Sequence, residues 1–238
     1  MLSIQENERL ARIGPGTHMG ELMRRFWVPF LESKELPTPD CVPVRVTLLG
    51  EHLVAFRDSD GRAGLVERHC PHRRADLFFG RNEEGGLRCT YHGWKFDLSG
   101  SCLDMPSEPQ SSNFKDKVRL VAYPVEERAG VLWAYMGPRE FQPEVPEFEW
   151  LNVPATHRYV SWNFQENNFA QAIEGGIDTV HSVYLHSSMD SHRRRDAWQE
   201  AGKQDLDPRR RYRTDDNPPV LQTHQTDFGI VIGSKYPG

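Results

Sequence analysis

The chain has few cysteines, no excess of basic residues and no long apolar run. The formal net charge of −5 over 238 residues argues against a nucleic-acid-binding protein, which usually carries a basic face. A membrane-spanning helix needs about 18 consecutive apolar residues, and the sequence has no such run. Residues 1–10 lack the apolar segment of a signal peptide. We therefore expect a cytoplasmic protein with no membrane or nucleic-acid partner.

The four cysteines are Cys41, Cys70, Cys89 and Cys102. In a reducing compartment, cysteines more often bind metals or remain buried thiols than form disulfides. No partner at a ligand spacing accompanies Cys41 or Cys102, so we expect free thiols there. The other two cysteines differ, because each has a histidine close by in the sequence.

Each of these two cysteines begins a short metal-ligand pattern. The first is C-P-H from Cys70 to His72, the second is C-x₂-H from Cys89 to His92, and residues 73–88 separate them. In a Rieske-type [2Fe–2S] centre, two cysteines bind one iron and two histidines bind the other. Because each loop supplies one cysteine and one histidine, the pattern predicts such a cluster.

A zinc site is the main alternative for the same four residues. Zinc sites with two cysteines and two histidines usually group each type together, as in C-x₂₋₄-C followed by H-x₃₋₅-H. Here the two types alternate along the chain, which favours the cluster. His69 is expected to point away from the metal, because neighbouring residues on a strand face opposite ways.

The organisation of the chain predicts a mainly β fold with some α. Residues 1–25 are expected to form a helical arm, and the prolines near residue 145 mark a boundary. Between them, short β-rich runs separated by turn residues predict an antiparallel β domain, so that the first domain is 1–145. The predicted strands cover 44–49, 52–57, 64–68, 87–91, 94–98 and 131–136. In 146–238 we expect an α+β segment. Its predicted elements are a strand over 158–164, a helix over 167–174 stopped by Gly175 and Gly176, and a last strand over 229–233.

The sequence resembles the α subunits of Rieske non-heme iron oxygenases, especially the phthalate dioxygenase-like branch. Besides the two ligand loops, the resemblance is carried by residues 20–29 (GELMRRFWVP), 91–97 (YHGWKFD) and 172–178 (AIEGGID). Respiratory-chain Rieske proteins have two further cysteines in the ligand loops, where this chain has Ala75 and Tyr91. That difference is typical of the oxygenase and ferredoxin types. The resemblance also implies that 146–238 form an incomplete helix-grip-like catalytic domain.

A second pattern, D-x₂-H-x₄-H, runs from Asp178 through His181 to His186. Non-heme Fe(II) oxygenases bind iron with two histidines and one carboxylate and leave the opposite face open. Asp178 and His181, at i and i+3, would share one face of a helix, whereas His186 requires the helix to end or distort first. Taken alone the pattern is weak, and ordinary surface or core histidines explain it better than a metal site does.

The resemblance implies that His181 and His186 bind a mononuclear Fe(II). Asp178 is then expected to link His181 to His92 of a neighbouring subunit, which requires subunits arranged head to tail, as in a homotrimer. The family's third iron ligand is an aspartate further downstream than this sequence reaches. Asp190 or Asp196 could replace it, although their spacing does not favour either.

The function implied by the resemblance is that of an oxygenase component in a ring-hydroxylating or O-demethylating system. Its partners would be an NAD(P)H-dependent flavin or iron–sulfur reductase, O₂ and a small aromatic substrate. The alternative is a Rieske ferredoxin-like electron carrier, or an inactive N-terminal fragment. Near the cluster, Lys95 and the pair Arg73 and Arg74 are candidates for contact with a reductase. Trp94, Phe96, Trp133 and Tyr135 are expected to fill the β core.

Overall fold

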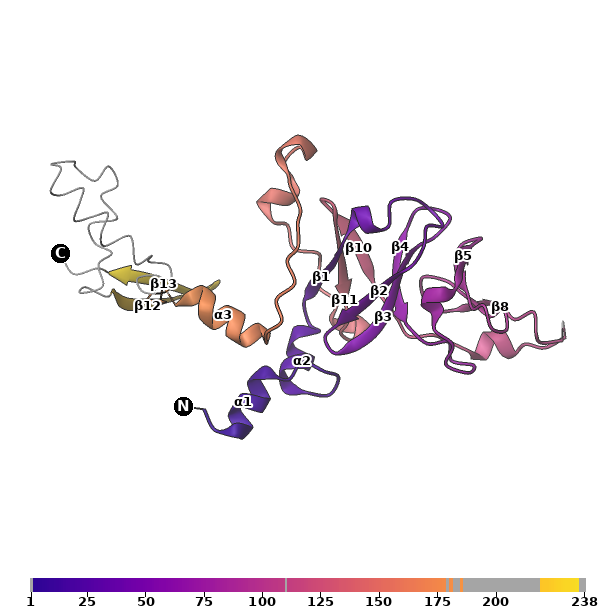
Figure 1. Cartoon of the computed structure of the whole chain (residues 1–238), viewed down its shortest axis with the longest axis horizontal. Helices are drawn as coiled ribbons and strands as arrows, with labels where there is room; N and C mark the ends of the chain where they lie inside the picture. The colour runs from indigo at the N-terminus through magenta and orange to yellow at the C-terminus, as the bar shows by residue number, and fades with distance from the viewer. Residues whose placement is uncertain (1, 110, 179, 182–184, 186–218, 236–238) are drawn as a thin grey trace. The chain divides into compact units, whose positions relative to one another are not determined.

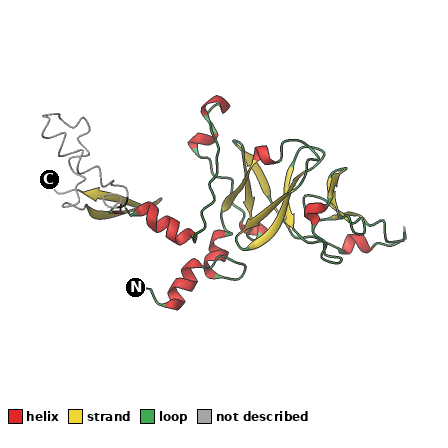
Figure 2. Ribbon diagram, viewed as in Figure 1, coloured by secondary structure: helices red, strands yellow, loops and turns green. Residues whose placement is uncertain are grey.

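The structure, a computed structural model, describes residues 2–109, 111–178, 180–181, 185 and 219–235. It divides into two compact units, Met1–Phe164 and Gln165–Gly238, which are described separately. Antiparallel strands dominate the first unit (Figure 2), which confirms the expected mainly β fold. None of the described helices is long and apolar enough to cross a bilayer.

The predicted helical arm consists of two short helices, α1 (Ile4–Ala11) and α2 (His18–Met23). Ser3 begins α1 with a capping box, since its hydroxyl accepts the Glu6 N–H while the Glu6 carboxylate accepts the Ser3 N–H. Thr17 caps α2 by accepting the N–H of Gly20. The sequence therefore specifies both helix starts locally.

Two antiparallel sheets form the body of the first unit, in the strand orders β1-β11-β10 and β2-β3-β4-β9. The strands predicted over 44–49, 52–57 and 64–68 are observed as β2, β3 and β4 with ends within one residue of the prediction. The pairing β1–β11, in contrast, joins distant parts of the sequence and was not predicted. The strands are β1 (Trp27–Glu32), β2 (Val44–Leu48), β3 (Glu51–Arg57), β4 (Ala63–Glu67), β9 (Ala122–Tyr123), β10 (Val125–Arg128) and β11 (Val131–Tyr135).

Strand β3 is buried on both faces. Leu53 and Ala55 pack into one core, which we call the base core, and Val54 and Phe56 pack into a second, the cluster-side core. Successive side chains on a strand face opposite ways, so this strand separates the two cores. The base core also contains Leu36, Val46, Leu49, Leu65, Leu132, Ala134 and Met136; the cluster-side core also contains Val66, Cys70, Leu77, Leu87, Cys89, Trp94, Phe96, Cys102, Met105 and Leu120.

A third sheet, in the order β5-β6-β7-β8, lies at one end of this unit (Figure 1). Its short strands are joined by tight turns, and the predicted strand over 87–91 ends at Arg88, so Cys89 lies in a turn. The strands are β5 (Arg81–Glu83), β6 (Gly86–Arg88), β7 (Lys95–Phe96) and β8 (Cys102–Asp104). The 3₁₀ turns of the described chain are Ser33–Glu35, Leu77–Phe79, Phe114–Lys117, Arg139–Phe141, Glu149–Leu151 and Ala155–His157.

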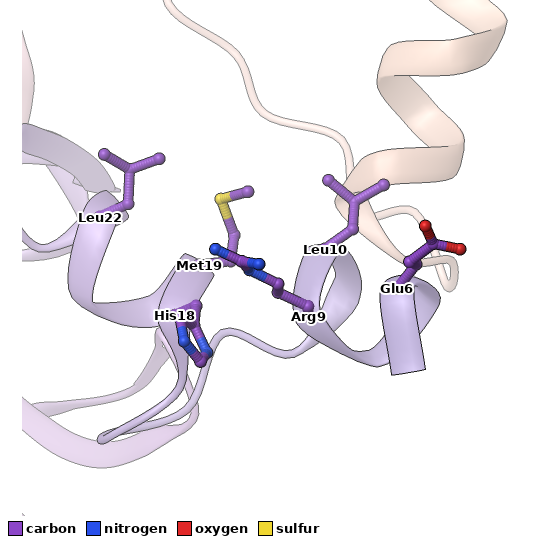
Figure 3. Close-up of a pocket in the computed structure, with 6 residues that line it drawn as sticks. All are labelled: Glu6, Arg9, Leu10, His18, Met19 and Leu22. Atoms are coloured by element: carbon purple, nitrogen blue, oxygen red, sulfur yellow. The ribbon is translucent and has the colours of Figure 1, made fainter. Parts of the chain in front are cut away.

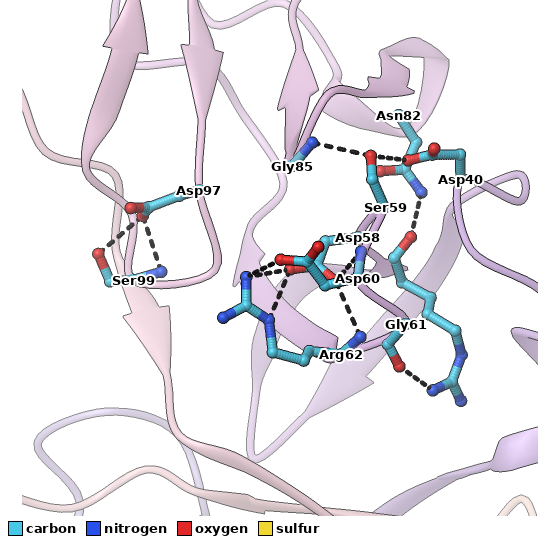
Figure 4. Close-up of polar contacts among 11 residues, drawn as sticks. Asp40, Asp58, Ser59, Asp60, Gly61, Arg62, Asn82, Gly85, Asp97 and Ser99 are labelled. Atoms are coloured by element: carbon cyan, nitrogen blue, oxygen red, sulfur yellow. Dashed lines mark hydrogen bonds and ion pairs between the residues drawn. The ribbon is translucent and has the colours of Figure 1, made fainter.

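Polar side chains hold this small sheet against the body of the unit (Figure 4). Asn82 on β5 donates from Nδ2 to the carbonyls of Cys41 at 3.0 Å and Arg57 at 2.7 Å. Nearby, the fully buried Asp58 carboxylate accepts the Arg62 N–H at 2.8 Å and the Arg62 guanidinium at 2.7 Å. Such satisfied buried groups fix the turn between β3 and β4. The sheet that carries the second ligand loop therefore has a defined position.

In the second unit, the described elements are α3 (Phe169–Ile177) and an antiparallel hairpin of β12 (Val220–Thr226) and β13 (Gly229–Lys235). The last strand was predicted correctly, whereas its partner β12 was not predicted. The expectation that Gly175 and Gly176 end the helix is wrong. The helix continues to Ile177, because a glycine only weakens a helix by about 1 kcal/mol, and the Asp178 N–H closes the last turn on Glu174 O.

The strand predicted over 158–164 is also wrong. These residues belong to the first unit and take part in no β ladder among the described residues. A β-rich run becomes a strand only where a partner strand is available, and the sequence pattern alone does not supply that information.

Candidate metal centre

The two predicted ligand loops have the same backbone design. In the first, the Cys70 N–H donates to Ala75 O at 2.9 Å and the Arg74 N–H donates to Cys70 O at 2.9 Å. In the second, the Cys89 N–H donates to Trp94 O at 2.8 Å and the Gly93 N–H donates to Cys89 O at 3.0 Å. Each loop is thus a closed turn that begins at a cysteine.

Both turns need a residue with positive φ at the same place. Gly93 has φ of 80°, and a Cβ there would lie 2.5 Å from Cγ of Pro106, so only glycine fits. Arg74 occupies the equivalent place in the first turn with φ of 58°. Its guanidinium forms an ion pair with Glu67, which holds the strained residue in position.

These turns bring the four predicted ligands together. The cysteines are only 1% and 3% exposed at positions 70 and 89 and belong to the same core. The His72 and His92 rings are half-buried, with centroids 4.5 Å apart and planes inclined at 61°. The matching loops therefore supply two buried thiols and two histidines that are nearer the surface, which is the donor set of a Rieske cluster.

The donor atoms are suited to metal binding. Nδ1 of His72 is buried and has no hydrogen-bond partner, which is costly for a polar atom unless a ligand satisfies it. Burial raises the pKa of the Cys70 thiol to about 12, so this thiol stays protonated until a metal displaces the proton. Burial, then His72 and Arg73, lower the pKa of His92, which favours the neutral imidazole that binds metals.

A zinc ion and a [2Fe–2S] cluster require different arrangements of protein donors. Within the described part of the chain, no three His, Cys, Asp or Glu side chains are placed to hold one metal ion. A structural zinc ion requires four donors around one point. A [2Fe–2S] cluster takes only two protein ligands at each iron, because sulfide supplies the rest. The geometry therefore fits the binuclear centre.

An ionic network organises the first ligand loop from outside. Asp76 follows this loop, and its Oδ2 accepts from Arg68 at 2.6 Å and from Arg45 at 3.0 Å, while Oδ1 accepts the Phe78 N–H at 3.0 Å. Burial raises the pKa of Asp76, but hydrogen bonds from Arg68, Phe78 and Arg45 outweigh it and lower the pKa to about 2. Asp76 was not among the site residues predicted from the sequence. Its only signal in the sequence is an acidic residue directly after the loop, with arginines nearby.

The proposed partner-facing role of Lys95 is wrong. This side chain is buried, and its Nζ pairs with the Glu84 carboxylate at 3.0 Å inside the small sheet. Arg73 and Arg74 are both exposed, and Arg74 pairs with Glu67. The expected core aromatics are confirmed, since Trp94, Phe96, Trp133 and Tyr135 are all buried. All four cysteines are free of disulfides, as expected for Cys41 and Cys102.

At the predicted iron site, the structure describes Asp178 and His181. The Asp178 Oδ2 lies 3.2 Å from His181 Nδ1, and its Oδ1 accepts the Val180 N–H at 2.8 Å. The Val180 N–H, together with His181, lowers the pKa of Asp178. With a proton on Nδ1, His181 keeps the lone pair of Nε2, as metal-binding histidines commonly do. His186, Asp190 and Asp196 lie outside the described residues.

A separate cavity of about 420 Å³ lies between α1 and α2 (Figure 3). Its walls are mostly apolar, and it has no group of metal-binding side chains. The lining residues are Glu6, Arg9, Leu10, His18, Met19 and Leu22. The paired ligand loops therefore remain the candidate functional site.

Comparison with known proteins identifies the class of protein to which this site belongs. Residues 26–124 match the family described as the Rieske [2Fe-2S] domain, so this part of the chain is a Rieske iron–sulfur domain. Residues 134–234 match the family described as LigXa C-terminal domain like. The chain belongs to the α subunits of Rieske oxygenases, in the phthalate dioxygenase-like branch.

Two relatives illustrate this membership. The 3-chlorobenzoate-3,4-dioxygenase oxygenase subunit of Comamonas testosteroni is 50% identical over 78% of this chain and 43% of its own length. The phthalate 4,5-dioxygenase oxygenase subunit of Pseudomonas putida is 42% identical over 97% of this chain and 51% of its own length. The chain thus spans about half the length of these relatives.

Solved structures agree with the fold. The NdmA QL mutant of Pseudomonas putida CBB5 with theobromine superimposes with a TM-score of 0.65 at 25% identity, over 89% of this chain and 58% of that chain. Dicamba monooxygenase bound to 3,6-dichlorosalicylic acid gives a TM-score of 0.59 at 27% identity, over 68% of this chain and 47% of that chain.

Proposed function

We propose that this chain carries the electron-transfer centre, and part of the iron site, of an oxygenase component that acts on a small aromatic substrate. The observation that supports this most directly is the pair of matching loops, which place two buried thiols and two histidines together in a Rieske domain. When bound, the cluster supplies one-electron transfer and a mononuclear Fe(II) supplies the activation of O₂.

The chain's own residues hold these groups. Cys70 and Cys89 would hold one iron of the cluster, and His72 and His92 would hold the other. His181 and His186 would hold the mononuclear Fe(II). Asp178 accepts a hydrogen bond from the Nδ1–H of His181 and so fixes the orientation of that imidazole. Protein ligands and hydrogen bonds of this kind tune a metal centre, whereas the oxygen chemistry belongs to the metal.

The partners follow from this assignment. A reductase that carries flavin or an iron–sulfur cluster takes electrons from NAD(P)H and passes them to the Rieske cluster. In the assembled enzyme, a homotrimer or a multiple of it with subunits arranged head to tail, Asp178 would connect His181 with His92 of the partner subunit. Residues 1–145 form the arm and cluster domain, and 146–238 begin the iron-binding domain.

The proposed substrate class is an aromatic carboxylate or aryl ether. Two relatives are named for 3-chlorobenzoate and phthalate, both aromatic carboxylates, and a third is a 5,5'-dehydrodivanillate O-demethylase subunit from a Sphingobium species, 45% identical over 79% of this chain and 44% of its own length. Ring hydroxylation and O-demethylation are therefore the two candidate reactions.

Iron and acid-labile sulfide, measured per chain on anaerobically purified protein, test this proposal. We expect two sulfides and about three irons, together with the electron paramagnetic resonance signal of a reduced Rieske cluster. The variant His181→Ala should lose only the iron in excess of sulfide. The variant Cys70→Ala should lose the sulfide and the Rieske signal.

Two other results of the iron and sulfide analysis would contradict parts of this proposal. Equal iron and sulfide, about two of each, would support an electron carrier or an inactive fragment and would contradict the binding of a mononuclear iron by this chain. Absence of sulfide from the wild-type protein would contradict the cluster itself.

A further inference from the structure

The two histidines of the cluster site have unlike surroundings. The ring of Trp94 stacks face to face on His72, with centroids 4.4 Å apart and planes only 7° from parallel. His92 instead meets Tyr91, whose side chain is 59% exposed, at a tilted 3.9 Å. One imidazole is therefore covered by a buried ring, and the other contacts a ring that faces water.

The indole of Trp94 is held in place on its remaining sides. It is only 4% exposed, and its Nε1–H donates to the Ser107 hydroxyl at 3.1 Å. The Phe114 ring meets it edge to face at 6.1 Å. A buried tryptophan usually finds a partner for its N–H, so the bond to Ser107 fixes the indole plane. The near-parallel stack on a candidate ligand is the contact that indicates a second role.

We propose that Trp94 is a positioning residue for the cluster, whose face fixes the plane of the His72 imidazole and keeps water away from it. The stacked indole thereby gives the cluster a lower reduction potential than it would have if His72 were not stacked. This inference rests on the proposed function, because it requires that His72 binds the cluster.

The direction of this change in reduction potential follows from the charge of the cluster in its two oxidation states. Two ferric ions, two sulfides and two thiolates sum to zero, so the oxidised cluster with neutral histidines is uncharged, and taking up one electron gives it one negative charge. The face of an aromatic ring carries negative potential, which disfavours that added charge. Exclusion of water disfavours it as well. Removing the indole should therefore favour the reduced cluster.

The test is a redox titration at fixed pH of the full chain with its cluster, followed by electron paramagnetic resonance. At a fixed solution potential near the midpoint, Trp94→Leu should raise the ratio of reduced to oxidised cluster several-fold, up to about tenfold. Trp94→Phe, which keeps an aromatic face, should restore most of the wild-type ratio. Ser107→Ala, which removes only the anchoring hydroxyl, should shift the ratio in the same direction by a smaller factor.

Phe96→Leu is the matched control, because Phe96 is a fully buried ring of the same core. It should leave the ratio unchanged. Wild-type ratios in Trp94→Leu and Ser107→Ala, or an equal shift in Phe96→Leu, would overturn the inference. If Trp94→Leu does not retain the cluster, the ratios of reduced to oxidised cluster in Ser107→Ala and Trp94→Phe test the inference instead. A wild-type protein without a Rieske signal would instead contradict the proposed function.

Discussion

The chemistry of the candidate centre depends on which atoms are buried and which are not. Both thiols lie inside the cluster-side core, whereas the histidine rings reach the surface. Electron exchange with a partner is then favoured through the imidazoles, since they are the candidate ligands that reach the surface of the domain. A change at either histidine should therefore alter the electronic properties of the centre more than the fold.

The first prediction concerns His72→Cys and His92→Cys. A thiolate adds a negative charge where the neutral imidazole had none, so each variant should shift the optical spectrum and lower the reduction potential. His69→Asn is the control, because His69 pairs with Asp76 in a β-bridge and approaches Arg74 rather than the centre. Absorption spectroscopy and redox titration measure the effect. Unchanged spectra in both ligand variants would contradict the assignment.

At this scale, the sequence predicted what is local. Spacing within two short loops identifies the candidate ligands, which are Cys70, His72, Cys89 and His92. Asp76, Ser107 and the stack of Trp94 on His72 depend on how β4, β7 and the segment after β8 meet in space. Residue spacing carries no information about such contacts, so they were not foreseen.

At the scale of elements, the first ligand loop depends on the ionic network around Asp76. The pKa of this carboxylate is lowered from 3.8 to about 2, so its stabilising contribution is present above pH 3.8 and is lost as the pH falls toward 2. Arg45, besides its bond to Asp76, covers the Phe78 ring at 3.9 Å. The network thus ties β2 and β4 to the chain that follows the loop.

The second prediction is that Asp76→Asn lowers the free energy of unfolding by about 1 kcal/mol at pH 7, and that this difference shrinks at pH 3. Urea unfolding at the two pH values measures it. Asp60→Asn is the control, because the Asp60–Arg62 pair is largely exposed and should contribute little. A difference that stays constant from pH 7 to pH 3 would refute the role of the Asp76 charge.

Strands were predicted well where the sequence alternates between turns and apolar runs, as in β2, β3 and β4. Prediction failed where a partner decides the outcome. The run over 158–164 finds no β partner among the described residues, and β12 is a strand only because β13 pairs with it. The helix α3 continued through two glycines because propensity is a weak local preference.

For the whole molecule, the helical arm is joined to the β body by a buried arginine. Arg24 follows α2, and its guanidinium donates to Glu51 at 2.8 Å and to the carbonyl of Leu49 at 2.9 Å. The Tyr123 hydroxyl donates to the other Glu51 oxygen at 2.6 Å, and burial, then this bond, raise the pKa of Tyr123. The arm, β3 and β9 therefore share one polar network.

The third prediction is that Arg24→Met lowers the free energy of unfolding by about 2–3 kcal/mol, because it leaves the Glu51 carboxylate without its cation. Arg12→Met provides the control, since the Arg12–Glu8 pair is exposed and should change stability by less than about 0.5 kcal/mol. Urea unfolding followed by tryptophan fluorescence measures both. Equal effects of the two substitutions would show that the Arg24 network does not join the arm to the body.

The two ligand loops have a further consequence for how this domain can change in evolution. Each loop closes on its own backbone hydrogen bonds, so its shape does not depend on the length of the β5–β6 hairpin between them. Insertions at the tip of that hairpin, around Glu84 and Gly85, would leave the backbone hydrogen bonds of both ligand loops intact. The tip of the hairpin can therefore vary in length while each ligand loop keeps its own backbone hydrogen bonds and its place in the shared core.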